Sequence, residues 1–165
     1  METADSIVIE LKVLVECLKK KELALSKIAS ITENQGDLLA SGLTHEEIYS
    51  IFMQMNDEKQ ESIQRVMECD QVFENVFRKV GPVLDANPTE YGDQVLELQE
   101  LIRVVMDLDV QIRVGEEGNS RLLTKALERI RVENAEKDKP DAIDSGEYGS
   151  NKVINAYKSQ SKRHD

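Results

Sequence analysis

The chain has 165 residues and a net charge of -11, with 32% charged residues and only 4% aromatic residues. Nucleic acids demand a basic protein face, so this charge argues against nucleic-acid binding. Without tryptophan and with few other aromatics, the composition does not supply a thick globular core, but it suits long helices that each bury one stripe.

The expected compartment is the cytoplasm. The residues from Met1 to Asp5 are acidic and lack the basic region of a signal peptide. The longest apolar runs are three or four residues, whereas a transmembrane helix needs about 20, so no membrane insertion is expected. Cys17 and Cys69 lie far apart and form no CxxC motif, which favours a reducing environment.

The first helix is expected from about residue 5 to 40, with a coiled-coil-like seam of period 3.5. Polar residues interrupt this seam at Lys21, Thr32 and Gln35. Such interruptions either fix the register or mark where a seam opens, and we favour the first interpretation. The seam comprises Ile7, Leu11, Leu14, Leu18, Leu25, Ile28 and Leu39.

A sharp turn is expected next. Ser41-Gly42 ends the first helix, with Gly42 expected as its left-handed C-terminal cap. Thr44 with Glu47 forms a capping box that opens a second helix over about 44–80. Gly81-Pro82 then ends that helix. So short a connection makes the two helices antiparallel neighbours.

This hairpin places Cys17 and Cys69 at about the same level. Equal counting along both arms puts residue 17 opposite residue 67. A disulfide is compatible with that geometry, but we favour two small buried apolar side chains.

A third long helix is expected over about 88–131, with Asn87 as its N-cap and Pro88 at its first position. Gly115 and Gly118 weaken it by about 1 kcal/mol each relative to alanine. Because the apolar stripe resumes in the same phase at Leu122, we expect the helix to run through both glycines.

The domain organisation follows. Residues 1–133 are expected to form an all-α domain: a long antiparallel helical hairpin with the third helix packed on it, bundle-like. Residues 134–165 read as an acidic linker and a flexible tail. The tail carries a short amphipathic stretch at Val153, Ile154 and Tyr157, too short to be a stable helix alone.

The sequence offers little chemistry. It contains no HExxH motif, no CxxC motif, no paired histidines and no glycine-rich phosphate loop. His45 beside Glu46 and Glu47 is best explained by the capping box and by acids favoured in a helix's first turn. Neither cysteine has a base partner. We therefore expect no metal, no cofactor and no enzymatic activity.

One segment resembles a known family. Residues 116–130, Glu-Glu-Gly-Asn-Ser-Arg-Leu-Leu-Thr-Lys-Ala-Leu-Glu-Arg-Ile, are similar to a stretch of the FlgN family of flagellar type III export chaperones. The hairpin and the tyrosine-bearing C-terminus also resemble that family. The glycines at 115 and 118 depart from its helical pattern.

The resemblance implies a cytoplasmic, ATP-independent chaperone. Such proteins bind the helical termini of hook-associated proteins at the hook–filament junction, prevent their premature assembly and deliver them to the export gate. A partner terminus would fold as a helix into an apolar groove. The expected partner-binding residues are Val95, Leu98, Ile102, Val105, Ile112, Asn119, Leu122, Leu123, Ala126, Leu127 and Ile130. Val153, Ile154 and Tyr157 are the candidate lid over that groove.

Three other interpretations remain open. The same heptads would serve a structural coiled-coil adaptor or homodimeric spacer. A filament-cap flagellar chaperone has similar size and helical content. An enzyme or ligand-binding bundle is disfavoured because no inward-facing His/Glu constellation is apparent. The sequence does not distinguish a monomer from a homodimer.

Overall fold

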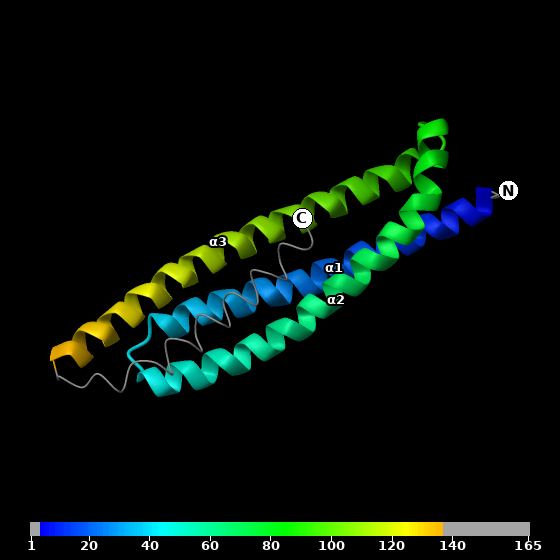
Figure 1. Cartoon of the computed structure of the whole chain (residues 1–165). Coiled ribbons are helices and arrows are strands. Elements are labelled where there is room, and N and C mark those ends of the chain that lie inside the picture. Colours follow the sequence, from blue (N-terminus) through cyan, green and yellow to red (C-terminus); the bar gives the residue numbers. More distant parts are fainter. Residues whose placement is uncertain (1–3, 137–165) are drawn as a thin grey trace. The chain divides into compact units, whose positions relative to one another are not determined.

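The computed structural model describes residues 4–136, and these form three α-helices and no strand (Figure 1). α1 spans Ala4–Leu39, α2 spans His45–Ala86 and α3 spans Gly92–Glu136. The predicted all-α, bundle-like fold is therefore confirmed. The predicted end of the third helix at about 131 and the predicted start of the tail at 134 are wrong, because α3 continues to Glu136. The rest of the predicted tail, including Val153, Ile154 and Tyr157, lies outside the described residues.

The described chain divides into two compact units, and each unit holds a segment of all three helices. Unit 1 comprises the residues up to Lys27 together with Ser62–Val110, and unit 2 comprises Ile28–Glu61 together with the residues from Gln111 onward. The predicted seam of α1 is buried along its length, except at Leu39, which is half-buried.

The two units differ in the chemistry of their cores. The buried apolar residues of unit 1 include Ile7, Leu11, Leu14, Leu18, Ile63, Val66, Val80, Tyr91, Leu98 and Val105. In unit 2 they are Ile28, Ala29, Ile31, Leu38, Phe52, Ile112 and Leu123. Unit 2 also buries Thr32, Gln35, Asn56, Lys59, Glu116 and Asn119, so its core is about half polar.

Within unit 2, α1 and α2 are antiparallel. Lys59 on α2 donates a hydrogen bond to Gln35 on α1, and Leu38 shares a buried cluster with Phe52. A step forward along α1 is thus a step backward along α2, as a short connection requires.

The connection between α1 and α2 is capped by side chains. The Leu38 carbonyl accepts hydrogen bonds from the Ser41 N–H at 3.1 Å and the Ser41 hydroxyl at 2.6 Å. Gly42 lies outside the left-handed region, so Ser41 rather than the predicted glycine caps α1. The Thr44 hydroxyl oxygen accepts from the Glu47 N–H at 3.3 Å, and the hydroxyl donates to the Glu47 carboxylate at 3.1 Å. These bonds make Thr44 the N-cap of α2.

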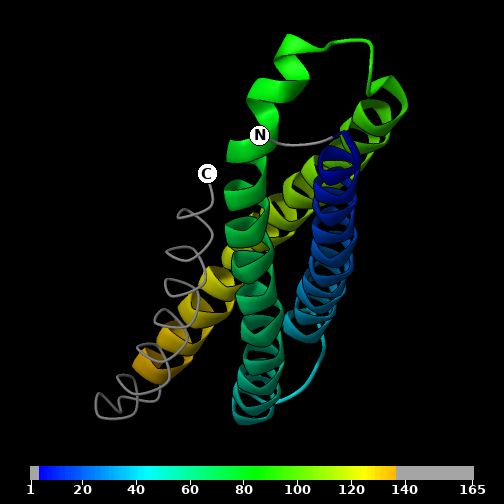
Figure 2. The ribbon, with the colours of Figure 1, turned by 90° about the vertical axis from the view of Figure 1, so that its right-hand side faces the viewer.

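The predicted end of the second helix at Gly81-Pro82 is wrong, because α2 continues through Pro82 to Ala86. Proline removes one N–H and bends a helix without necessarily ending it. The last turns of α2 do bend away from the rest of the helix (Figures 1 and 2). Gly81 is buried, and a Cβ there would meet the Phe77 ring at 3.4 Å.

The predicted start of the third helix is also wrong. Asn87 ends α2 instead of opening α3: its side-chain amide donates to the Val83 carbonyl at 2.9 Å and its N–H to the same carbonyl at 3.1 Å. Four turn residues follow, and the first helical bond of α3 joins the Val95 N–H to the Tyr91 carbonyl at 3.0 Å. The predicted continuity through Gly115 and Gly118 is confirmed.

Candidate functional site

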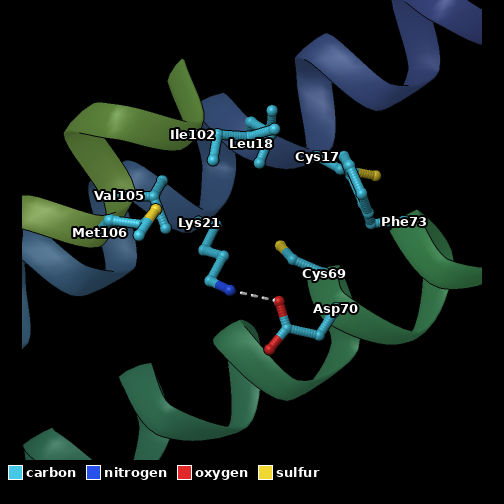
Figure 3. Close-up of a pocket in the computed structure, with 9 residues that line it drawn as sticks. All are labelled: Cys17, Leu18, Lys21, Cys69, Asp70, Phe73, Ile102, Val105 and Met106. Carbon is cyan, nitrogen blue, oxygen red and sulfur yellow. Dashed lines mark hydrogen bonds and ion pairs between the residues drawn. The ribbon is translucent and has the colours of Figure 1, made fainter. Parts of the chain in front are cut away.

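A groove in unit 1 is lined by side chains from all three helices (Figure 3). Its volume is ≈ 270 Å³. The lining residues are Cys17, Leu18 and Lys21 from α1, Cys69, Asp70 and Phe73 from α2, and Ile102, Val105 and Met106 from α3. Most of these side chains are apolar, so the groove offers dispersion and hydrophobic contacts more than hydrogen bonds.

One wall of the groove is a stretch of α2 whose apolar stripe is only partly covered by the described residues of unit 1. Val66, Phe73 and Val80 recur every seven residues and so lie on one face of the helix. Val66 and Val80 are buried, but Phe73 is only half-buried and Phe77 is 46% exposed. The Phe73 and Phe77 rings stack with centroids 5.8 Å apart. Two aromatic side chains thus lie on a face that the described residues of unit 1 leave partly accessible.

The opposite wall is formed by α3. Ile102 and Met106 lie one turn apart and are 38% and 62% exposed, whereas Val105 between them is buried. Val110, a further turn along, is exposed too. The apolar surface of the groove therefore continues onto the outer face of α3.

An ion pair lies at the groove. Lys21 Nζ donates to Asp70 Oδ1 at 2.6 Å, which joins α1 to α2, and both side chains are partly exposed (Figure 3). Lys21 is one of the three polar interruptions predicted in the seam of the first helix. A partly exposed pair of this kind contributes little to stability but limits how the two helices slide.

Cys17 and Cys69 both line this groove, at the level that counting along the two arms predicts. Both are free thiols, Cys17 buried and Cys69 half-buried. Burial raises the pKa of Cys17, and its neighbour Cys69 raises it further. Burial likewise raises the pKa of Cys69, with Asp70 adding to the effect. Because the thiolate is the reactive form, these thiols are poor nucleophiles.

Unit 2 contains a second feature, a buried polar layer made by Thr32 and Gln35 of α1, Lys59 of α2, and Glu116 and Asn119 of α3. Lys59 Nζ donates both to the Glu116 carboxylate and to Gln35 Oε1. The Thr32 hydroxyl donates to the Ile28 carbonyl at 2.7 Å and contacts Glu116 at 3.2 Å. The layer therefore ties all three helices together.

Two small residues let α1 and α3 come close at this layer. A Cβ on Gly115 would lie 2.9 Å from Thr32 Cγ2, and a Cβ on Gly36 would lie 2.8 Å from Asn119 Oδ1. Asn119 Nδ2 donates to the Thr32 carbonyl at 2.9 Å. The neighbouring pairs are Thr32 with Gly115 and Gly36 with Asn119, so the residue number rises along both helices in the same direction. α1 and α3 therefore run parallel in unit 2. This close approach is a structural reason for glycine at position 115, where the sequence departs from the helical pattern of the FlgN family that it resembles.

Lys59 is the residue that sequence reasoning missed. Burial lowers its pKa, and the neighbouring Glu116 opposes that effect only in part. A signal was available, because Lys59 lies on the same helical stripe as Phe52, Ile63 and Val66, at spacings of seven, four and three along that series. A lysine on a stripe otherwise apolar indicates a buried partner of opposite charge.

The predicted partner-binding residues fall into two groups. Leu98, Val105, Ile112, Asn119 and Leu123 are buried inside the two units. The others are at least partly accessible: Val95, Ile102, Leu122, Ala126, Leu127 and Ile130. Only Ile102 and Val105 lie in the groove of unit 1. Partner binding by these residues stays a prediction.

No cluster of three or more His, Cys, Asp or Glu side chains within residues 4–136 is arranged to hold a metal ion. No helix in that range is long and apolar enough to cross a membrane.

Comparisons with known protein families, with curated proteins and with solved structures find no match to this chain. The likeness of residues 116–130 to the FlgN family therefore stays a prediction from the sequence, and the groove and the polar layer carry the functional argument.

Proposed function

We propose that this chain is a cytoplasmic export chaperone of the FlgN kind, which binds the helical terminus of a hook-associated protein and delivers it to the export gate. The observation that carries the binding part is the groove of unit 1. Its walls present apolar residues at helical spacing on two helices, and neither wall is covered by another described part of unit 1.

An amphipathic helix is the occupant that such a groove fits. Side chains at i, i+3, i+4 and i+7 of a partner helix meet ridges at the same spacing on α2 and α3. The volume of ≈ 270 Å³ falls below the range of about 300–1,000 Å³ that is usual for small-molecule sites. It suits a few anchoring side chains of a longer ligand that lies across the opening.

The flagellar part of the proposal has a separate support, which is the resemblance of residues 116–130. Within that stretch, Glu116 and Asn119 bond to Lys59 and Thr32 inside unit 2. The polar positions of the stretch thus maintain the fold, while the groove supplies the binding surface. The two parts of the proposal are tested separately.

The test is a fluorescence-anisotropy titration of the full chain with labelled synthetic peptides. One peptide set covers the terminal helical segments of hook-associated proteins, and a second covers those of the filament-cap protein. We expect binding of the first set, with a gain of helical circular dichroism in the peptide. Binding of the second set alone would identify a filament-cap chaperone instead.

Variants locate the site. Phe73→Asp and Met106→Asp are expected to weaken peptide binding about 30-fold, the effect of losing an interface residue worth about 2 kcal/mol. Leu23→Asp is the matched control, because Leu23 is 73% exposed and does not line the groove. An equal loss of peptide affinity in Leu23→Asp would mean that the groove is not the binding site. A stable homodimer in light scattering, with no peptide binding, would favour the structural spacer.

A further inference from the structure

In unit 2, the middle of the α3 segment that packs on α1 and α2 has no buried apolar side chain among its described residues. Ile112 and Leu123 are the buried apolar residues of α3 in this unit, within the described range. They are separated by eleven residues, about three helical turns. The buried residues between them are Glu116 and Asn119, both polar.

The polar contacts in this stretch add little net stability. An ion pair taken out of water loses most of its hydration free energy, and replacing such a pair by apolar residues is often neutral or stabilising. Gln35 Nε2 is buried and has no hydrogen-bond partner among the described residues. Separation of the helices would return water to Lys59, Glu116 and Gln35.

The contact of α1 with α2 in the same unit is different. Leu38 and Phe52 form a buried apolar cluster, against which five partly buried apolar side chains pack: Leu39, Ile48, Ile51, Met53 and Met55. Removing this surface from water stabilises the hairpin by about 25 cal/mol per Å². The hairpin therefore has the stronger apolar contact, and α3 the weaker one.

We propose that three residues of the polar layer, Lys59, Glu116 and Gln35, form a latch, at which the α3 segment Gln111–Glu136 opens from unit 2 while the α1–α2 hairpin of that unit stays folded. When the α3 segment closes, it returns to one register against α1 and α2, because Glu116 meets Lys59 and Asn119 meets Thr32 at one position only. Opening exposes Ile112, Asn119 and Leu123, three of the predicted partner-binding residues. Opening itself does not depend on the proposed function; use of the exposed face by a partner does.

Hydrogen–deuterium exchange of the unmodified full chain tests the latch. A separated single helix with two glycines frays, so its amides exchange. We expect amides of residues 112–130 to be at least about tenfold less protected than those of Ile28–Leu38, which corresponds to 1.4 kcal/mol. Equal protection in both segments would mean that unit 2 opens only as a whole, and it would overturn the proposal.

A variant tests the role of the layer. A triple variant replaces the three latch residues by apolar side chains of similar size: Gln35→Leu, Lys59→Met and Glu116→Leu. We expect exchange of residues 112–130 to slow about tenfold or more, with exchange of Ile28–Leu38 little changed. The matched control is Glu117→Gln with Arg121→Gln, an exposed pair on the same helix whose atoms lie 3.7 Å apart. If exchange of residues 112–130 is unchanged in the triple variant, or slows equally in the control, the latch is refuted.

Discussion

Two glycines three residues apart on α3 are expected to respond differently to the same substitution: alanine stabilises the fold at one and does not at the other. Alanine is favoured over glycine in a helix by about 1 kcal/mol. At Gly118 a new Cβ would meet nothing within 4 Å, so Gly118→Ala is expected to raise the free energy of unfolding by about 0.5–1 kcal/mol. At Gly115 the Cβ would lie 2.9 Å from Thr32 Cγ2.

The contact at Gly115 is not easily relieved. Thr32 is buried, and its hydroxyl donates to the Ile28 carbonyl at 2.7 Å, so the methyl group does not rotate away without breaking that bond. Overpacking of this kind costs about 1–3 kcal/mol, which cancels or exceeds the gain in helix propensity. Gly115→Ala is thus expected to be less stable than Gly118→Ala by about 1–3 kcal/mol.

Urea unfolding followed by circular dichroism measures this difference. A double-mutant cycle with Thr32→Ser identifies the cause, because serine keeps the hydroxyl and removes the methyl group. We expect Gly115→Ala and Thr32→Ser to couple favourably by about 0.5–3 kcal/mol. Equal stabilisation by both glycine substitutions, or a coupling near zero, would refute the close approach of α1 and α3.

Three further predictions concern buried groups. Lys59→Ala, which leaves Glu116 without its buried cation, should lower the free energy of unfolding by about 3–5 kcal/mol; Arg78→Ala, at an exposed pair, should lower it by at most about 1 kcal/mol, and urea denaturation compares the two. Because the pKa values of Cys17 and Cys69 are raised in the folded state, these two thiols stay protonated there at pH values above their ordinary pKa of 9.0. The stability that this shift contributes is therefore present below pH 9.0 and is lost as pH rises through the pKa values of the folded state. Urea midpoints at about pH 8 and about pH 10 should differ more for the unmodified chain than for a variant with alanine at both cysteines. Leu14 is fully buried, so Leu14→Ala should lower the free energy of unfolding by about 2–5 kcal/mol, and a loss below 1 kcal/mol in the same assay would mean that this core position repacks.

The sequence predicts the helices well where local rules decide. The bounds of α1 differ from the prediction by one residue at each end, and Thr44 caps α2 as its spacing to Glu47 indicates. The errors lie at Pro82, at Pro88 and at the end of α3, which runs to Glu136 instead of about 131. A proline restricts the backbone without deciding whether a helix bends or ends, because neighbouring packing makes that choice.

The sites were less accessible to sequence reasoning. Phe73 follows the apolar periodicity of α2, but periodicity does not reveal that the described parts of the neighbouring helices leave this side chain partly accessible. The burial of Lys59 depends on Gln35 and Glu116, which lie 24 and 57 residues away in the chain. Lys59 becomes a core residue because three helices approach at one level, and its place on the stripe of α2 does not identify the partners that it meets there.

The polar layer also restricts how this chain can change length during evolution. Inserting one residue in α3 before Glu116 would turn its carboxylate by about 100° around the helix, away from Lys59. The buried ammonium group would lose its counter-ion, a change that few sequences survive. Length changes are expected to be tolerated in the connections at 40–44 and 87–90, where no side chain is buried. Relatives of this chain are therefore expected to vary in these two turns while keeping the spacing of their helices constant.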